Sequence, residues 1–188
     1  AIVISVDEKT GMQALGRKYP SKPPTAGREG RMDYEYVRNG TRKLLCAFDI
    51  RTGKVYGEMR ENRCAKDLVE FMDTLAGMLP QDKEIHVVWD NLNTHYDGPS
   101  KRWTKFNERH GGRFHFHYTP IHASWVNQVE LFFGILQKRV IRYCEYNSLE
   151  ELDEAAYSFM DHWNEHEAHP FRWTFKGYPC QLGDEAAA

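Results

Sequence analysis

The stretch Ile2-Val-Ile-Ser-Val-Asp7 decides the fold, because it is a short and nearly continuous apolar run that ends in an aspartate. The stretch Ile85-His-Val-Val-Trp-Asp90 repeats this pattern farther along the chain. Runs of this length are typical of strands that are buried on both faces of a sheet. Ligands of crossover α/β sheets gather at the carboxyl ends of the strands. If the two strands are neighbours, their terminal aspartates therefore lie close together at one sheet edge.

Working outward from these strands, we expect a mixed sheet with helices on both of its faces. Further strands are predicted at residues 44–50, 54–60 and 114–118, the first two forming a hairpin. Helical spacing of apolar residues predicts helices at 64–79, about 100–109, 125–142 and from the capping box at Ser148 onward. Segment 8–40, rich in Gly, Pro and charge, is interpreted as a long loop with room for an added hairpin. This order predicts an α/β fold with a mixed five-stranded sheet.

Composition bounds the class of protein. The 188 residues are 41% hydrophobic and 13% aromatic, which suits one packed globular domain. No apolar run approaches the roughly 18 residues of a membrane span, and the N-terminus does not resemble a signal peptide. We therefore expect no membrane contact. The four cysteines are widely spaced and form no C-x-x-C pair, so free thiols in a reducing cytoplasm are expected (Cys46, Cys64, Cys144 and Cys180).

Charge is segregated along the chain although the formal net charge is only −2. Residues 143–171 contain acidic side chains and no Lys or Arg, whereas residues 99–142 are basic apart from Glu108 and Glu130. This pattern allows a basic surface for phosphates beside an acidic helix. The acidic helix would then pack on a region outside this chain or shield the site. Ordinary solvated faces explain the composition equally well.

Glu130 is a third acid in an unexpected place, because it lies between Val129 and Leu131 on an apolar helix. A carboxylate there is costly unless it has a partner, and neighbouring carboxylates repel unless a cation lies between them. Oxygen ligands of this kind suit Mg²⁺ or Mn²⁺. A pair of such ions can activate a water or a 3′-hydroxyl for displacement at phosphorus. Each acid alone has a structural explanation, but Asp7, Asp90 and Glu130 together favour phosphoryl transfer.

Other polar and aromatic residues carry weaker predictions. His115 and His117 share one face of a strand and are expected to be half-buried. Asp49 precedes an Arg-Thr-Gly turn and is interpreted as structural. Four tryptophans are expected to be packing residues (Trp103, Trp125, Trp163 and Trp173). The chain has no P-loop, dinucleotide-binding glycine pattern or nucleophile elbow.

These motifs, taken in order, resemble a known family. They are Val6-Asp-Glu-Lys-Thr-Gly-Met-Gln-Ala-Leu15, Tyr34–Thr41 with Ala47–Val55, Trp89-Asp-Asn-Leu-Asn-Thr-His95, and Thr119-Pro-Ile-His-Ala-Ser-Trp-Val-Asn-Gln-Val-Glu130. From about Val3 to Pro179 the chain resembles the catalytic domain of bacterial insertion-sequence transposases of the mariner superfamily. These are DDE enzymes with the ribonuclease H-like fold that retroviral integrases share.

The resemblance implies roles for particular residues. Asp7, Asp90 and Glu130 would be the catalytic triad and would bind two Mg²⁺ ions, with Mn²⁺ as a substitute. Three further residues would orient a carboxylate or contact DNA (Asn91, His95 and Asn127). Six basic residues would contact DNA phosphates (Lys101, Arg102, Lys105, Lys138, Arg139 and Arg142).

The resemblance also implies a reaction and its partners. Residues 1–180 would be the catalytic domain and 181–188 a tail, with an N-terminal helix-turn-helix region absent from this chain. A homodimer would cut the terminal inverted repeats of a transposon and join them to target DNA at TA, in the bacterial cytoplasm at the nucleoid. Two alternatives stay open: a nuclease of the same fold without strand transfer, and a domesticated DNA-binding domain without catalysis.

Overall fold

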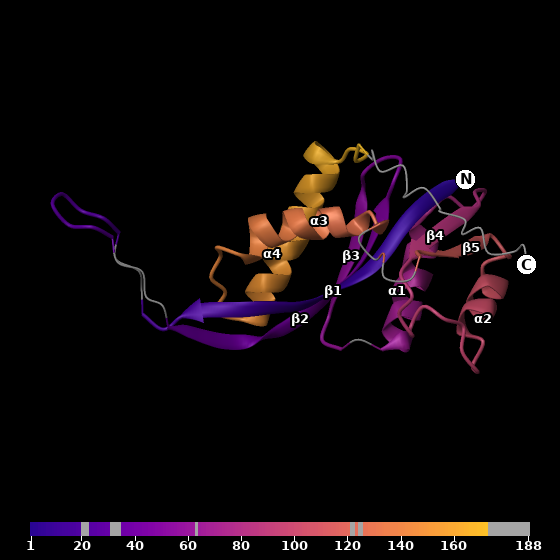
Figure 1. The fold of residues 1–188 in the computed structure, drawn as a ribbon, viewed down its shortest axis with the longest axis horizontal. Helices are drawn as coiled ribbons and strands as arrows, with labels where there is room; N and C mark the ends of the chain where they lie inside the picture. The colour runs from indigo at the N-terminus through magenta and orange to yellow at the C-terminus, as the bar shows by residue number, and fades with distance from the viewer. Residues whose placement is uncertain (20–22, 31–34, 63, 121–122, 124–125, 173–188) are drawn as a thin grey trace, which may run out of the picture.

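The computed structural model describes residues 1–19, 23–30, 35–62, 64–120, 123 and 126–172. Figure 1 shows the arrangement of the helices and strands. In chain order they are β1 (Ile2–Arg17), β2 (Tyr36–Asp49), β3 (Val55–Arg60), α1 (Ala65–Met78), β4 (Ile85–Trp89), α2 (Arg102–Arg109), β5 (Phe114–Tyr118), α3 (Val129–Leu136) and α4 (Leu149–His162). Short π-helical turns extend α3 over Gln137–Ile141 and α4 over Trp163–Glu167.

The strands of the described chain form a five-stranded mixed sheet in the order β3-β2-β1-β4-β5. Strands β1, β2 and β3 form an antiparallel meander, whereas β4 and β5 run parallel to β1. The predicted mixed sheet is confirmed. Strands β1 and β4 are neighbours, with Ser5 paired to Val88, so the aspartates two residues farther along lie at the same level of the sheet.

Residues 8–40 were predicted to be a long loop with room for an added hairpin; the loop was wrong at both ends, whereas the antiparallel pairing of β1 with β2 agrees with the hairpin. Strand β1 continues to Arg17 and β2 already begins at Tyr36, so the two form a long ribbon that projects from the molecule in Figure 1. The pairing shifts register twice, between Lys9 and Met12 and between Gln13 and Leu15. These bulges interrupt the alternation of polar and apolar residues that identifies a strand in a sequence, while the backbone ladder continues across them.

Helices cover both faces of the sheet, as predicted. One apolar cluster joins α1 and α2 to side chains such as Ile4, Val87 and Trp89. A second cluster, on the opposite face, joins α3 and α4 to side chains that include Cys46 and Phe48. Alternate residues of β1 therefore point into different clusters. Ser5 and Asp7 face the side that α3 covers, because Ile4 and Val6 belong to the first cluster.

The predicted helices form, although some of their boundaries differ. Helix α1 agrees with the predicted range, and α2 begins at Arg102, two residues after the expected start. The carboxylate of Asp97 accepts hydrogen bonds from the backbone N–H groups of Trp103 (2.6 Å) and Thr104 (3.0 Å), so it caps α2 from outside the helix. The described part of α3 begins at Val129, and the expected start at Trp125 lies outside the described residues.

The acidic segment forms helix α4, which packs against one face of the sheet. Leu152, Ala156 and Met160 of α4 are buried in the second apolar cluster. Arginines at other places in the chain pair with its acids: Arg42 with Asp153 and Arg139 with Glu167. The acidic charge of this segment is thus partly neutralised within the described chain.

Two further predictions concern the cysteines and the tryptophans. Cys46, Cys64 and Cys144 are free thiols, as expected, and Cys180 lies outside the described residues. Trp103 and Trp163 are buried core residues, whereas Trp125 and Trp173 lie outside the described residues. Among the residues the structure describes, no helix has the length and apolar character needed to cross a bilayer.

Candidate active site

Asp7 lies inside β1 and not at its end, which corrects the sequence prediction. It is nevertheless at the carboxyl end of the parallel part of the sheet, because the pairing of β1 with β4 stops at Ser5 and Val88. Beyond that point Asp7 pairs only with Cys46 of β2. Its side chain is almost buried, with 7% of the residue exposed, and its Oδ1 accepts a hydrogen bond from the Glu8 backbone N–H at 2.7 Å.

Asp90 directly follows β4, and its side chain is fixed from two directions. Its Oδ1 accepts a hydrogen bond from the Leu92 backbone N–H at 3.1 Å, which closes a tight turn. The same Oδ1 lies 2.8 Å from Nδ1 of His95, which is fully buried and stacks on Trp89 with ring centroids 4.8 Å apart. The same Nδ1 lies 2.9 Å from the Asp90 backbone carbonyl, so His95 holds the backbone of Asp90 as well as lying beside its carboxylate.

Asn91 points away from the carboxylates. Its Nδ2 donates a hydrogen bond to the Thr119 carbonyl at 2.6 Å, and its Oδ1 accepts one from the Tyr96 hydroxyl at 2.9 Å. These bonds tie the turn after β4 to the segment after β5. Asn91 thus holds the loop that carries Asp90, and in this structure it does not contact a carboxylate of the site.

Glu130 lies in the first turn of α3, on its exposed side. The helix turns Val129 inward and Glu130 outward, so the carboxylate is not enclosed by the apolar residues that flank it in the sequence. Lys9 of β1 is its cationic neighbour and lies over the Phe133 ring at 5.9 Å from the centroid. Burial lowers the pKa of Lys9, and the charge of Glu130 opposes this shift. The sequence analysis did not single out Lys9.

A buried polar bridge connects α3 to β1 beneath the carboxylates. Asn127 is fully buried, and its Nδ2 donates hydrogen bonds to the Val6 carbonyl at 2.9 Å and to Asp7 Oδ2 at 3.1 Å. Its Oδ1 accepts a hydrogen bond from the Ser5 hydroxyl, which in turn accepts one from the Val129 backbone N–H. Asn127 therefore sets the orientation of Asp7 and the position of the helix that carries Glu130.

Ser5 is the member of this bridge that the sequence analysis missed. It is the one polar residue inside the apolar run from Ile2 to Val6, and it is fully buried. A buried hydroxyl requires a hydrogen-bond partner, so a serine at this place in a doubly buried strand is a signal of a polar bridge. The sequence therefore indicates that Ser5 has a partner, but it does not identify Asn127, which is 122 residues away along the chain.

The three acids form one electrostatic unit. The pKa of Asp7 is raised to about 7, chiefly by burial, and the charges of Asp90 and Glu130 contribute to this rise while the hydrogen bond from Glu8 opposes it. Partial burial also raises the pKa of Glu130, with Asp90 adding to the shift and Lys9 opposing it. Carboxylates that disfavour one another's ionisation in this way are what a divalent cation neutralises. The donor set, made of carboxylate oxygens, fits Mg²⁺ or Mn²⁺.

The basic residues predicted to meet DNA are divided between two places. Lys101 and Arg102 lie where α2 begins, on the connection that follows Asp90, and Lys105 is exposed one turn later. Lys138, Arg139 and Arg142 lie at the other end of the α3 helix from Glu130. Arg139 forms an ion pair with Glu167 at 2.6 Å. The charge of Arg139 is therefore partly neutralised within the described chain.

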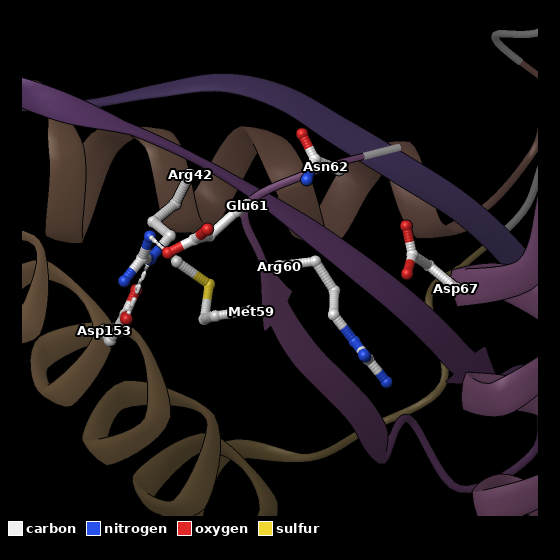
Figure 2. A pocket seen from close by; sticks show the side chains of 7 residues that line it. All are labelled: Arg42, Met59, Arg60, Glu61, Asn62, Asp67 and Asp153. Carbon is white, nitrogen blue, oxygen red and sulfur yellow. Dashed lines mark hydrogen bonds and ion pairs between the residues drawn. The ribbon is translucent and has the colours of Figure 1, made fainter. Parts of the chain in front are cut away.

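The hollow drawn in Figure 2 is not lined by Asp7, Asp90 or Glu130. Its volume is about 300 Å³, and its lining residues come from the ends of β2 and β3, from α1 and from α4 (Arg42, Met59, Arg60, Glu61, Asn62, Asp67 and Asp153). Within it Arg42 binds Asp153 at 2.9 Å and Glu61 at 3.1 Å. These ion pairs connect secondary structures, so we assign the hollow a structural role.

Comparison with known proteins identifies the class. The sequence profile of the DDE superfamily endonucleases matches residues 3–153, most of the chain. The chain belongs to this family. It is therefore an endonuclease domain of the DDE type, in a class of polynucleotidyl transferases that use divalent metal ions. No curated protein matches the sequence significantly.

Solved structures agree with this class at the level of the fold. The Mos1 strand transfer complex gives a TM-score of 0.60 at 13% identity, over 88% of this chain and 47% of that chain. The intasome of simian T-cell lymphotropic virus, in complex with PP2A regulatory subunit B56 gamma, gives 0.60 at 13% identity, over 87% and 48%. The Mos1 mariner paired end complex with Mn gives 0.54 at 14% identity, over 87% and 52%.

These matches confirm the ribonuclease H-like fold expected from the sequence. At identities of 13–14% they establish the fold alone. The chain spans about half the length of these structures.

Proposed function

We propose that this chain is the catalytic domain of a transposase that cuts the ends of a DNA element and joins them to target DNA. The observation that carries the proposal is the electrostatic unit of Asp7, Asp90 and Glu130, whose acids stand at one edge of a ribonuclease H-like sheet. Two solved structures of the same fold are a Mos1 strand transfer complex and a Mos1 mariner paired end complex.

Asp7, Asp90 and Glu130 would hold two Mg²⁺ ions, or Mn²⁺ in their place. Bound divalent ions would supply an activated hydroxyl and stabilise the oxygen that leaves phosphorus. The remaining contributions come from the chain itself. Asn127 fixes one oxygen of Asp7, and His95 fixes the Asp90 carboxylate at its Oδ1. Lys9 offsets the charge of Glu130 and lowers the cost of holding that carboxylate ionised.

The partners of the reaction follow from the same proposal. The substrate would be double-stranded DNA that carries terminal inverted repeats, with TA as the target and a homodimer as the active form. The basic residues at the start of α2 would contact phosphates, which gives salt-dependent binding with little sequence preference. A bacterial cytoplasm with its nucleoid would be the compartment.

Two other functions predict different products. A nuclease of the same fold would hydrolyse DNA without joining strands, and a domesticated domain would bind DNA without any metal-dependent chemistry. The intact set of three acids argues against the domesticated domain, because neighbouring carboxylates repel one another unless a cation lies between them.

Product analysis distinguishes these functions. The chain is incubated in Mn²⁺ with a labelled, pre-cut oligonucleotide end and a supercoiled plasmid, and the products are separated on a gel. A transposase domain attaches the label covalently to the plasmid. Nicked plasmid without attached label would instead establish a nuclease, and unchanged plasmid with a shifted, protein-bound fragment would establish a binding domain.

A further inference from the structure

A second group of metal-ligating side chains lies on β4 and β5. His86 and His115 are paired directly across the two strands, and His117 is paired with Val88. Ile85 and Phe114, their neighbours along the strands, are buried on the face that α1 and α2 cover. The three imidazoles therefore project from the opposite face of the sheet. The side chain of His115 is 43% exposed, close to the half-buried state predicted for it, and His117 is exposed.

The ligand atoms of this group already lie close together. One ligand atom each from Glu84, His86 and His115 lies within 4.8 Å of the other two. Glu84 Oε1 is 4.0 Å from His115 Nε2, and His86 Nδ1 is 2.9 Å from His117 Nε2. Ligands at about 2.0–2.1 Å from a tetrahedral Zn²⁺ are separated by roughly 3.3 Å. Small side-chain rotations would bring these atoms to that spacing.

We propose that Glu84, His86 and His115 form a binding site for a transition-metal ion of the Zn²⁺ type. Two imidazoles and a carboxylate are a donor set that Zn²⁺ accepts, with a fourth position left for water or for His117. Mg²⁺ prefers oxygen ligands, so the two sites would select different metals. Strand β5 is an edge of the described sheet, and an ion bound here would connect it to β4.

The site is separate from the three acids of the candidate active site. His86 precedes Asp90 by four residues of extended chain, which corresponds to about 13 Å along a strand. Occupation of one site therefore does not require the ligands of the other. This separation allows the histidine site to be tested in a chain from which the carboxylate site has been removed.

Zinc titration of the untagged chain tests the proposal. The background is the Asp7→Asn/Asp90→Asn variant, stripped with EDTA and dialysed, and binding is measured by calorimetry with Zn²⁺. We expect one Zn²⁺ to bind per chain and His86→Ala/His115→Ala to weaken binding by at least about 10-fold. His162→Ala/His166→Ala is the matched control, because these two exposed rings also lie close together, with centroids 4.9 Å apart.

Three outcomes of the titration would overturn the proposal: no Zn²⁺ binding in the background chain, unchanged binding after His86→Ala/His115→Ala, or an equal loss in the control. Circular dichroism checks that each variant is folded, and His115→Asn, at an exposed position, replaces the double variant if that one unfolds. X-ray absorption of the zinc-loaded background chain should give only nitrogen and oxygen neighbours. Sulfur in the first shell would assign the ion to the cysteines and contradict the proposal.

Discussion

Asn127 is the residue on which the orientation of the candidate site depends most. It is fully buried and binds Asp7 and the Val6 carbonyl through one amide nitrogen. We expect Asn127→Ala to destabilise the fold by about 1–3 kcal/mol, because it leaves the Ser5 hydroxyl and the Val6 carbonyl without this partner. We also expect a 10–100-fold loss of joining activity, as is usual when the group that orients a metal ligand is removed.

Chemical denaturation and single-turnover joining measure the two effects of Asn127→Ala. Asn91→Ala is the matched control, since that amide also holds a loop but contacts no carboxylate of the site. Its activity should fall by less than that of Asn127→Ala. Equal losses in the two variants would show that the contact with Asp7 has no special importance.

The raised pKa of Asp7 makes the stability of the chain depend on pH. Its pKa is raised from 3.8 to about 7, so between these values the folded chain holds a proton that the unfolded chain has lost. The metal-free chain should therefore lose stability as pH rises from about 4 to 7, by at most about 4 kcal/mol. Asp7→Asn should flatten this slope, and Mg²⁺ should stabilise the parent chain most at high pH.

Thermal unfolding in EDTA at pH 5, 6, 7 and 8 checks this dependence. The parent chain should melt at a lower temperature at pH 8 than at pH 5, whereas Asp7→Asn should change little over the same interval. If the two chains show the same slope, other groups dominate the titration and Asp7 does not carry the unfavourable charge proposed for it.

At the scale of the helices and strands, Arg42 connects three of them. This residue of β2 pairs with Asp153 of α4 and with Glu61 just beyond β3 (Figure 2), and only 12% of its side chain is exposed. The hydrogen bond to Asp153 raises the pKa of Arg42. We expect Arg42→Ala to lower the free energy of unfolding by about 1–2 kcal/mol, because these charge-assisted bonds are lost.

Urea denaturation measures the effect of Arg42→Ala. Arg51→Ala serves as its control, since Arg51 is exposed in the turn after β2 and should cost less than about 0.5 kcal/mol. A loss in the Arg42 variant no larger than in this control would mean that the ion pairs contribute nothing to the docking of α4.

Most of the secondary structure could be predicted from the sequence, because periodicity records which side of a segment is buried. The apolar spacing of α1 and the alternation in β5 are examples. The continuation of β1 to Arg17 could not, since its two bulges break the alternation and its hydrogen-bond partners lie in β2. The sequence also identified Asp90 as an acid that follows a strand, whereas Asp7 lies inside β1 and the bridge from Ser5 to Asn127 depends on tertiary contacts.

At the scale of the whole molecule, the placement of basic residues determines how DNA binding responds to salt. Lys101 and Lys105 lie at the start of α2, in the segment that follows Asp90. Arg51 and Lys54 lie in the turn after β2, which is next to the amino end of β1. If each lysine of α2 contacts one phosphate, Lys101→Ala/Lys105→Ala should reduce the slope of log K against log salt by about 2. Arg51→Ala/Lys54→Ala should leave the slope unchanged.

Fluorescence anisotropy of a labelled duplex at several salt concentrations measures both slopes. Binding should weaken for the α2 variant at low salt and converge with the parent at high salt. If the slope falls in the Arg51/Lys54 variant and is unchanged in the α2 variant, the DNA binds at the amino end of β1, away from the carboxylates.

Asp90→Asn tests whether the three acids of this fold act as one metal-dependent site. Asp49→Asn is the matched control, because Asp49 also ends a strand and accepts a hydrogen bond from the backbone two residues later, at 2.8 Å. Single-turnover joining of a pre-cut DNA end is measured in Mn²⁺ for the parent and both variants. We predict that Asp90→Asn loses at least about 1,000-fold in rate and that Asp49→Asn retains activity near that of the parent. Joining by Asp90→Asn at the parent rate, or an equal loss in Asp49→Asn, would contradict the account.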